Sequence, residues 1–471
     1  MRVLKTNKRT KKNRGSQALA RLGLGDGRVL VYGLGKSGIS SAHLLSHHRI
    51  PFGFYDDNEV ASYRTLSSTI HWPDVPVQFG GLTPEALVEY DLVVVSPGVP
   101  AHARSVQVIQ DAGLRIISEI ELAYAFAQAP VVAVTGTNGK TTTVTMADEL
   151  LRKAGLKSVA TGNIGYPFCT AVMDPAPDYY VLEVSSFQLY HTTHFHPKVS
   201  VITSFAPNHL DWHGDEQDYF DSKLKIAQNQ TARDTAIYPA GHARIKKALA
   251  KRPAKLIGVG PRGQVTYSAK DHTITRTLPS GKKQVWARLA GVVAGLPYDF
   301  RCASEAAQMV AAIAIALGVK AAAFVEMIAE FRPLKHRIER VGVKDGVTWV
   351  NDSKSTSIDA TIFALKKYTE PVVLMLGGRD KGLDFGDVVE PARKNVKAII
   401  AFGEARDKIA REIGKELPIH KEKDLPHAIA RARKLARSGD VVLFSPACAS
   451  YDQFKNYEER GDTFRKLVGE L

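Results

Sequence analysis

The chain alternates short, unbroken apolar runs with longer segments in which apolar residues recur every three or four positions. Runs such as Val131–Thr135 and Val372–Leu376 have the length and composition of strands buried on both faces. Segments such as the alanine-rich stretch Ala303–Leu317 have the spacing of closely packed helices. Strands that alternate with helices in this way predict an α/β protein built on mostly parallel sheets.

One strand leads directly into a phosphate-loop pattern, because the stretch from Val131 to Thr143 reads VVAVTGTNGKTTT. A strand, a glycine turn and a helix in this order direct backbone N–H groups and the helix dipole at one point, where a polyphosphate would bind. The usual G-x-x-x-x-G-K-[ST] pattern has a glycine where this chain has Val134, and an ordinary glycine turn is the alternative interpretation. The predicted ATP ligands in this loop are Gly136, Thr137, Asn138, Gly139, Lys140, Thr141 and Thr142, with the Thr141 hydroxyl on magnesium.

A second glycine pattern, G-x-G-x-x-G at residues 33–38, also follows a strand and precedes a helix. This pattern is typical of nicotinamide or flavin sites, but the same turn can hold any nucleotide diphosphate. Asp56 closes the next strand at the distance expected of a ribose-binding acid. The candidate ligands around this turn are Gly35, Lys36, Ser37, Asp56, Ser96, Pro97 and Gly98.

Polar residues follow other strands of the central and last parts of the chain. Glu183 ends an apolar run beside the phosphate loop and is a candidate magnesium ligand, with an ordinary surface acid as the alternative. Three later strands end in Asn351–Thr356, Gly377–Gly382 and Ser445–Ser450, which predicts a binding cleft at one sheet edge. The central histidines lack the spacing of a zinc site.

The length of 471 residues exceeds what one hydrophobic core supports, so several domains are expected. We predict a basic, disordered tail at residues 1–16 and three domains at residues 17–124, 125–332 and 333–471. The first and third are Rossmann-like, and the central one is a P-loop-type mononucleotide-binding ATPase domain.

The formal charge of +15 invites a nucleic-acid hypothesis, but seven of these cations lie before residue 15 and no nucleic-acid motif is present. No apolar segment is long enough to span a bilayer, and no apolar run follows the basic tail as in a secretory signal. The three cysteines are far apart, which favours a reduced cytoplasmic setting. We therefore expect neither a nucleic-acid nor a membrane partner.

Seven strings together resemble the Mur ligase family in order and spacing, from about residue 28 to the end. They are TGTNGKTT, EVSSFQL, NHLDWHG with the later SKLKI, LKHRIE, NDSKST, LGGRDKG and SPACASYDQFKNYEERGDTF. The resemblance implies an ATP-dependent, ADP-forming amide ligase of peptidoglycan precursor synthesis, and hence of cell-wall growth, cell shape and division. It would add glutamate, expected to be D-glutamate, to UDP-N-acetylmuramoyl-L-alanine through an acyl phosphate, as a cytoplasmic monomer.

The resemblance also implies roles for individual residues. Two magnesium ions would be held by Thr141, Glu183, His209 and Lys223, with Lys223 carbamylated. Asn163 and Ser185 would contact the UDP substrate, and Arg337, Asp352 and Lys354 would meet ATP. Glutamate would be held by Thr356, Lys381, Ser450 and Tyr457, and the catalytic set would be Lys140, Lys223, His209 and Lys381.

Two departures from the family pattern leave alternatives open. The usual H-N-x-x-N is replaced by Arg301-Cys302-Ala303-Ser304-Glu305, which puts the expected adenine contacts in doubt. The usual K-x-T-N ends in Ser357 instead of asparagine. An amide ligase for L-glutamate or another amino acid remains an alternative, as do a nicotinamide dehydrogenase and a nucleic-acid-binding ATPase.

Overall fold

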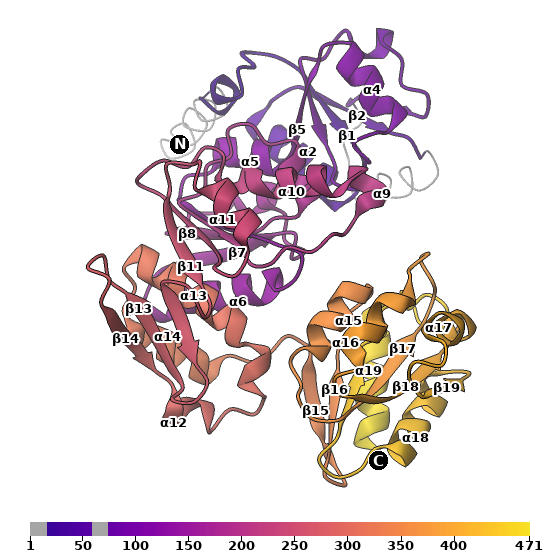
Figure 1. Cartoon of the computed structure of the whole chain (residues 1–471). Coiled ribbons are helices and arrows are strands. Elements are labelled where there is room, and N and C mark those ends of the chain that lie inside the picture. Colours follow the sequence, from indigo (N-terminus) through magenta and orange to yellow (C-terminus); the bar gives the residue numbers. More distant parts are fainter. Residues whose placement is uncertain (1–16, 59–73) are drawn as a thin grey trace, which may run out of the picture. The chain divides into compact units, whose positions relative to one another are not determined.

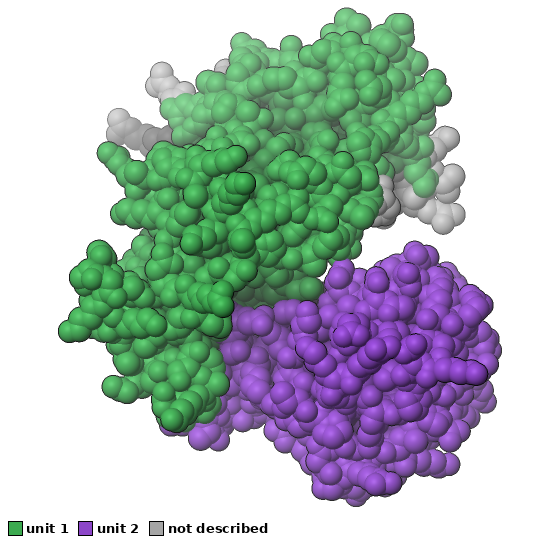
Figure 2. All heavy atoms as spheres, viewed as in Figure 1, with its two compact units in different colours: residues 1–290, 306–328 green, residues 291–305, 329–471 purple. Residues whose placement is uncertain are grey.

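The structure is a computed structural model that describes residues 17–58 and 74–471 (Figures 1 and 2). These residues form two compact units, of which the first runs to Ala290 and also includes Ala306–Ile328. The second comprises Gly291–Glu305 and Ala329–Leu471. The predicted α/β class is confirmed, because the described chain contains three mainly parallel sheets. The predicted tail lies outside the described residues, and the predicted domain boundaries stay predictions.

The first sheet is fully parallel, with the strand order β3-β2-β1-β4-β5 of a Rossmann-like domain. Its strands are β1 (Val29–Tyr32), β2 (Phe52–Asp56), β3 (Val77–Phe79), β4 (Leu92–Val95) and β5 (Arg115–Ser118). Its helices are α2 (Lys36–His48), α4 (Arg104–Asp111) and α5 (Glu119–Phe126), with η1 (Glu85–Leu87) between β3 and β4. The strand order reverses between β1 and β4, which is where an open α/β sheet binds its ligand.

The second sheet has the order β14-β13-β12-β11-β10-β9-β6-β8-β7 and carries the phosphate loop on a central strand. Its strands are β6 (Val131–Thr135), β7 (Ser158–Gly162), β8 (Tyr179–Glu183), β9 (Val199–Ile202), β10 (Thr235–Pro239), β11 (Lys255–Val259), β12 (Val265–Ser268), β13 (Thr273–Thr277) and β14 (Lys283–Arg288). Its helices are α6 (Lys140–Lys153), α7 (Phe168–Ala171), α8 (Ser186–Tyr190), α9 (Leu210–His213), α10 (Glu216–Leu224), η2 (Lys225–Ala227), α11 (Ala243–Leu249), α13 (Ser304–Leu317) and α14 (Ala321–Glu330). Two short helices between β14 and α13, α12 (Ala290–Val293) and η3 (Phe300–Cys302), lie in or at the start of the segment Gly291–Glu305, which groups with the second unit.

The third sheet lies in the second unit and has the order β15-β16-β20-β17-β18-β19, with only β15 antiparallel. Its strands are β15 (Glu339–Lys344), β16 (Val347–Asn351), β17 (Val372–Gly377), β18 (Val396–Phe402), β19 (Ile419–Glu422) and β20 (Val441–Phe444). Its helices are α15 (Ile358–Leu365), η4 (Phe385–Val388), α16 (Val389–Ala392), α17 (Arg406–Ile413), α18 (Leu425–Leu435) and α19 (Tyr457–Gly469).

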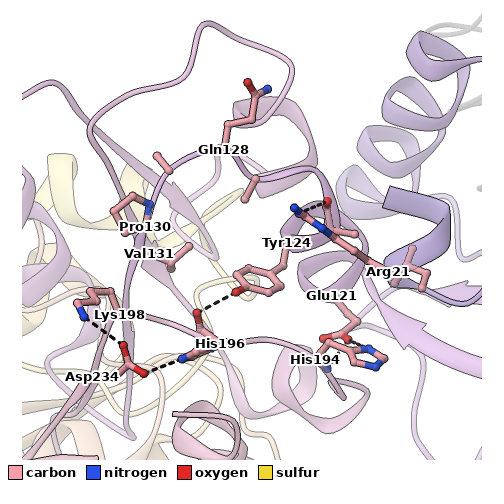
Figure 3. A pocket seen from close by; sticks show the side chains of 14 residues that line it. Arg21, Glu121, Tyr124, Gln128, Pro130, Val131, His194, His196, Lys198 and Asp234 are labelled. Carbon is pink, nitrogen blue, oxygen red and sulfur yellow. Dashed lines mark hydrogen bonds and ion pairs between the residues drawn. The ribbon is translucent and has the colours of Figure 1, made fainter. Parts of the chain in front are cut away.

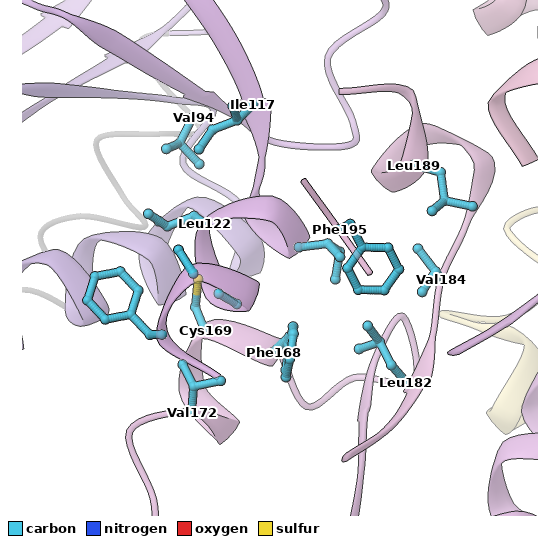
Figure 4. Packing of buried hydrophobic residues seen from close by; sticks show 14 of the residues in the cluster. Val94, Ile117, Leu122, Phe168, Cys169, Val172, Leu182, Val184, Leu189 and Phe195 are labelled. Atoms are coloured by element: carbon cyan, nitrogen blue, oxygen red, sulfur yellow. The ribbon is translucent and has the colours of Figure 1, made fainter. Parts of the chain in front are cut away.

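One continuous hydrophobic cluster joins the first two sheets into a single unit (Figure 4). Val94 and Ile117 come from the first sheet, Leu182 comes from the second, and Phe168 and Cys169 belong to the short helix α7. The Phe168 ring meets the Tyr180 ring edge to face, with 5.2 Å between their centroids. Because both sheets contribute to this cluster, the glycine turn at residues 33–38 and the phosphate loop belong to the same compact unit.

We predict that Phe168→Ala lowers the free energy of unfolding of the first unit by about 3–5 kcal/mol, since it leaves a cavity in this shared core. Val88→Ala is the matched control, because Val88 is 82% exposed and its loss should change stability by less than about 0.5 kcal/mol. Thermal and denaturant unfolding of both variants measure the difference. Equal stability of the two variants would contradict a core shared by the two sheets.

Candidate active site

The phosphate loop is held in shape by the end of strand β9. Gly136 has φ +146°, and a Cβ atom there would lie 2.1 Å from the Thr203 hydroxyl oxygen. That hydroxyl donates to the carbonyl oxygens of Asn138, at 2.5 Å, and Thr135, at 3.1 Å. Gly139 has φ +84° and is the N-cap of α6. Glycine is therefore required at these turn positions by backbone conformation and, at Gly136, by space.

The side chains of the loop face inward over its own backbone. The Lys140 ammonium donates to the carbonyl oxygens of Gly136, at 2.6 Å, and Thr137, at 2.9 Å. The Thr137 hydroxyl donates to the carbonyl of Ala206, and its oxygen lies 3.2 Å from the hydroxyl of Tyr219. Thr141 and Thr142 lie in the first turn of α6. The predicted strand, loop and helix are confirmed in order and position.

Lys223, on α10, lies directly beneath this loop. The residue is only 3% exposed, which is unusual for a lysine. Its ammonium nitrogen lies 3.2 Å from the Gly136 carbonyl oxygen and 4.4 Å from the centre of the Tyr219 ring. Burial and the positive charge of Lys140 hold the pKa of Lys223 well below its usual range. This shift favours the neutral amine of Lys223 over its ammonium form.

Glu183 ends strand β8 and is also buried, at 3% exposed, so the interpretation of a surface acid is wrong. One carboxylate oxygen accepts a hydrogen bond from the Asn163 side chain at 2.8 Å. The other, Oε2, is buried and accepts no hydrogen bond from the described residues. A buried carboxylate oxygen with spare acceptor capacity beside a phosphate loop fits a magnesium ligand.

His209 precedes α9 in a left-handed conformation, with φ +56°. Its ring lies edge-on to Phe187, at 4.9 Å between centroids, and 6.3 Å from Tyr219, the residue beneath Lys223. Among residues 17–58 and 74–471 no three His, Cys, Asp or Glu side chains converge as a metal cluster. A magnesium site here would thus need Thr141 and a modified Lys223 in addition to Glu183 and His209.

The first sheet presents a separate cavity of about 440 Å³ at its strand reversal. All seven candidates from the first domain line it: Gly35, Lys36, Ser37, Asp56, Ser96, Pro97 and Gly98. Asp56 accepts a hydrogen bond from the backbone N–H of Leu34 at 2.8 Å, which fixes the turn. Asn163 and Ser185 do not line this cavity. Asn163 binds Glu183, and Ser185 caps helix α8 by accepting from Gln188 N.

The sequence analysis missed Asp57 and Tyr32, which line the same cavity. Burial alone would raise the pKa of Asp57, but hydrogen bonds from Ser105, Tyr32 and Tyr55 outweigh it and lower the pKa. The result is a fixed carboxylate at the cavity wall. Only its position directly after Asp56 could have indicated it from the sequence.

In the second unit, the three predicted strand ends do meet at one sheet edge. The Ser355 and Ser445 hydroxyls donate to the Asp352 carboxylate at 2.5 and 2.7 Å. The Lys381 ammonium donates to the carbonyl oxygen of Thr356 at 3.3 Å. Ser450 is buried, and the Lys354 ammonium lies 5.1 Å from the centre of the Tyr457 ring. Arg337 precedes Ile338, whose N–H donates to Asp352.

Arg460 is a further residue that the sequence analysis missed, although it lies within a string used for the family resemblance. It is fully buried and donates to the carbonyl oxygens of Ser353, at 2.8 Å, and Cys448, at 3.1 Å. Burial lowers the pKa of this guanidinium to about 10. Arg460 therefore joins the loops that follow β16 and β20, which carry Thr356 and Ser450.

The two departures from the family pattern have structural explanations. Ser357 is the N-cap of α15, and its hydroxyl accepts from Ala360 N at 3.4 Å, a role that serine and asparagine share. Arg301 binds Asp299 and Glu370, and Glu305 binds Lys367 at 2.7 Å. These charges attach the segment Gly291–Glu305 to the second unit.

Another cavity, of about 560 Å³, lies at the opposite end of β6 from the phosphate loop (Figure 3). Glu121 of α5 accepts hydrogen bonds from the N–H groups of His194 and Phe195, and Asp234 pairs with His196 at 2.7 Å. The Glu121 contacts attach α5 to the loop before β9, and the Asp234 pair attaches that loop to the start of β10. The residues that line this cavity therefore form a joint between the first and second sheets within the first unit, and none of them is a predicted site residue.

Within the described residues, no helix has the length and apolarity that crossing a membrane requires.

Three family models match successive parts of the chain. They are the Mur ligase MurD-like N-terminal domain at residues 27–118, the Mur ligase middle domain at residues 134–292 and the Mur ligase glutamate ligase domain at residues 336–448. A phosphate loop on a mainly parallel sheet, with a Rossmann-like sheet before it and another after it along the chain, thus defines a three-domain nucleotide-dependent ligase fold.

Curated relatives agree with these matches. A protein of Salinibacter ruber is 37% identical over 470 residues, covering 94% of this chain and 98% of the relative. A protein of Myxococcus xanthus is 34% identical, covering 96% of this chain and all of the relative. Both are named UDP-N-acetylmuramoylalanine–D-glutamate ligase. The chain belongs to the Mur ligase family, as the sequence resemblance predicted.

Solved structures share the fold at low identity. The MurF ligase of Thermotoga maritima in complex with ADP has a TM-score of 0.58 at 15% identity, covering 94% of this chain and 96% of that one. A pseudomurein peptide ligase type C from Methanothermus fervidus has a TM-score of 0.57 at 14% identity, covering 94% of this chain and 99% of that one.

Asp352 gives the second unit a pH-dependent stability. Burial raises its pKa from 3.8 to about 6, against opposing hydrogen bonds from Ser355 and Ser445. Because the folded chain then binds the proton more tightly than the unfolded chain, its stability falls as pH rises from about 4 to 6, by about 3 kcal/mol. Asp352→Asn should remove this slope in denaturant unfolding of the second unit. Parallel pH profiles of variant and wild type would contradict the assignment.

Proposed function

We propose that this chain joins D-glutamate to UDP-N-acetylmuramoyl-L-alanine with the conversion of ATP to ADP and phosphate. The observation that carries the proposal is that Lys223 and Glu183 are each buried near the phosphate loop, in a chain whose relatives are named for that reaction. A loop that binds polyphosphate, together with a buried lysine and a buried carboxylate, suits phosphoryl transfer rather than hydride transfer.

The proposed reaction has two steps. An oxygen of the substrate carboxylate attacks the γ-phosphorus of ATP, the bond to the β-phosphate oxygen breaks, and ADP leaves. The glutamate amine then attacks the acyl carbon of the acyl phosphate, the carbon–oxygen bond to phosphate breaks, and the amine loses a proton. Both steps bring anionic groups together, so the site must supply positive charge.

Lys140 and the backbone N–H groups of the loop would hold the ATP phosphates. Magnesium, when bound by Thr141, Glu183, His209 and modified Lys223, would neutralise the charge of the transferred group. The unsatisfied oxygen of Glu183 supports this ligand set. We propose two ions, and the ATP role of Arg337, Asp352 and Lys354 stays a prediction.

We propose further that the Lys223 amine is carbamylated. The neutral amine attacks carbon dioxide, a nitrogen–carbon bond forms, one carbon–oxygen π bond opens and one proton is lost to solvent, so that a buried neutral amine becomes a carboxylate-like anion. The depressed pKa of Lys223 supports this step, because only the unprotonated amine is nucleophilic. The resulting anion would also relieve the repulsion from Lys140.

We assign the UDP substrate and glutamate each to the edge of a different sheet. The UDP group would lie in the cavity of the first sheet, lined by Lys36, Asp56 and the turn at Ser96. Glutamate would lie at the strand ends of the third sheet, with Lys381 paired to one carboxylate and Thr356, Ser450 and Tyr457 around it. We also propose a cytoplasmic monomer with a role in cell-wall growth and division.

Phosphate release from ATP tests the proposed function directly. Purified protein should release phosphate only when UDP-N-acetylmuramoyl-L-alanine and D-glutamate are both present. Replacing D-glutamate by L-glutamate or other amino acids should reduce the rate to background. A preference for another amino acid would assign a related amide ligase instead, and release without either substrate would overturn the proposal.

We predict that Lys223→Ala lowers kcat roughly a hundredfold or more, because the buried anion is lost from the phosphoryl-transfer site. Lys225→Ala, two residues further along, is the matched control and should keep most of the activity. Added formate or acetate should restore part of the Lys223→Ala rate by taking the place of the carbamate. Equal rates for both variants would contradict the role of Lys223.

A further inference from the structure

A chain of hydrogen bonds lies behind the phosphate loop, outside the residues discussed so far as ligands. His213 Nδ1 lies 2.8 Å from an Asp218 carboxylate oxygen, and His213 Nε2 lies 2.9 Å from the Ser186 hydroxyl oxygen. An ionised carboxylate only accepts hydrogen bonds, so Nδ1 carries the proton. Nε2 is then the acceptor, and the Ser186 hydroxyl donates to it.

These three residues lie on three different short helices. Ser186 begins α8, His213 ends α9, and Asp218 lies in the first turn of α10. Each helix is adjacent to one expected magnesium ligand. Glu183 precedes α8, His209 precedes α9, and Lys223 lies on α10. The two hydrogen bonds of one imidazole thus connect the elements that carry three separate ligands.

The ring of His213 is also packed between side chains that touch those ligands. Phe187 stacks on His213, with 5.5 Å between centroids, and its ring meets that of His209 at 4.9 Å. On another side, Tyr219 lies 5.2 Å from His213 and directly beneath the Lys223 ammonium. Because the His213 side chain is fully buried, a displacement of its ring must move these neighbours.

A hydrogen-bonded series of Asp, His and Ser also occurs in nucleophilic triads, where the histidine activates the serine. Ser186 is only 2% exposed, so its hydroxyl has no room to meet a carbonyl substrate. The geometry therefore favours a positioning role over a nucleophilic one.

We propose that His213 is a positioning residue. Through its hydrogen bonds to Ser186 and Asp218, it aligns Glu183, His209 and Lys223 for magnesium, an inference that rests on the proposed function. Groups that orient metal ligands typically change metal affinity by roughly 10- to 100-fold when removed. His213 touches no expected substrate atom, so its loss should act on metal binding before it acts on other steps.

The test is binding of Mn²⁺, as a paramagnetic substitute for Mg²⁺, to the full chain with a non-hydrolysable ATP analogue, followed by electron paramagnetic resonance. His213→Phe keeps the packed ring but removes both hydrogen bonds, and it should weaken Mn²⁺ binding roughly tenfold or more. His194→Phe is the control, because His194 pairs with Glu121 at the joint and should leave Mn²⁺ affinity unchanged. Activity assays should show a matching rise in the magnesium concentration for half-maximal rate.

Ser186→Ala is the second variant, needed if His213→Phe does not fold. It removes one bond to His213, and it should weaken Mn²⁺ binding roughly threefold or more while the fold is kept. Wild-type Mn²⁺ affinity in the folded variants would overturn the inference. A wild-type protein that binds Mn²⁺ normally but shows no glutamate-dependent phosphate release would overturn the proposed function instead.

Discussion

The burial of Lys223 next to Lys140 is the interaction on which the rest of the site depends. An ammonium removed from water and placed near another cation is costly, and one carbonyl bond at 3.2 Å compensates for little of that cost. A protein that only needed to fill this space would be more stable with an apolar side chain. The position makes physical sense if the amine is neutral in the folded chain and then becomes an anion that ligates a cation.

Contacts within the first unit connect this site to the cavity of the first sheet. Helix α5 begins with Ser118 N bound to the carbonyl of His191, continues with Glu121 bound to the turn at His194, and ends with Tyr124 bound to His196. The buried cluster around Phe168 fills the space between the two sheets. The phosphate loop and the glycine turn at residues 33–38 therefore belong to one compact unit.

Much of this architecture could be predicted from the sequence because parallel strands buried on both faces are unbroken apolar runs. The run Val131–Thr135 matches β6 to the residue, and the run Val372–Leu376 matches all of β17 except its last residue, Gly377. The strands β12, β13 and β14 were missed, since they are rich in polar residues and their burial does not alternate regularly, which hides the strand period.

Candidate site residues were predictable where a side chain suited to the chemistry lies at the end of a strand or in the turn that follows it, as at Lys140, Glu183 and Asp56. It was not predictable where the fold brings distant residues together. The burial of Lys223, the bond from Arg460 to Ser353 and the contact of His213 with Ser186 depend on packing between elements, which residue spacing does not reveal.

Carbon-13 nuclear magnetic resonance of the protein equilibrated with labelled bicarbonate tests whether Lys223 becomes a carbamate. We expect a slowly exchanging carbamate resonance in the wild type that disappears in Lys223→Arg and persists in Lys225→Arg. Absence of that resonance from the wild type, or its persistence in Lys223→Arg, would show that Lys223 is not carbamylated.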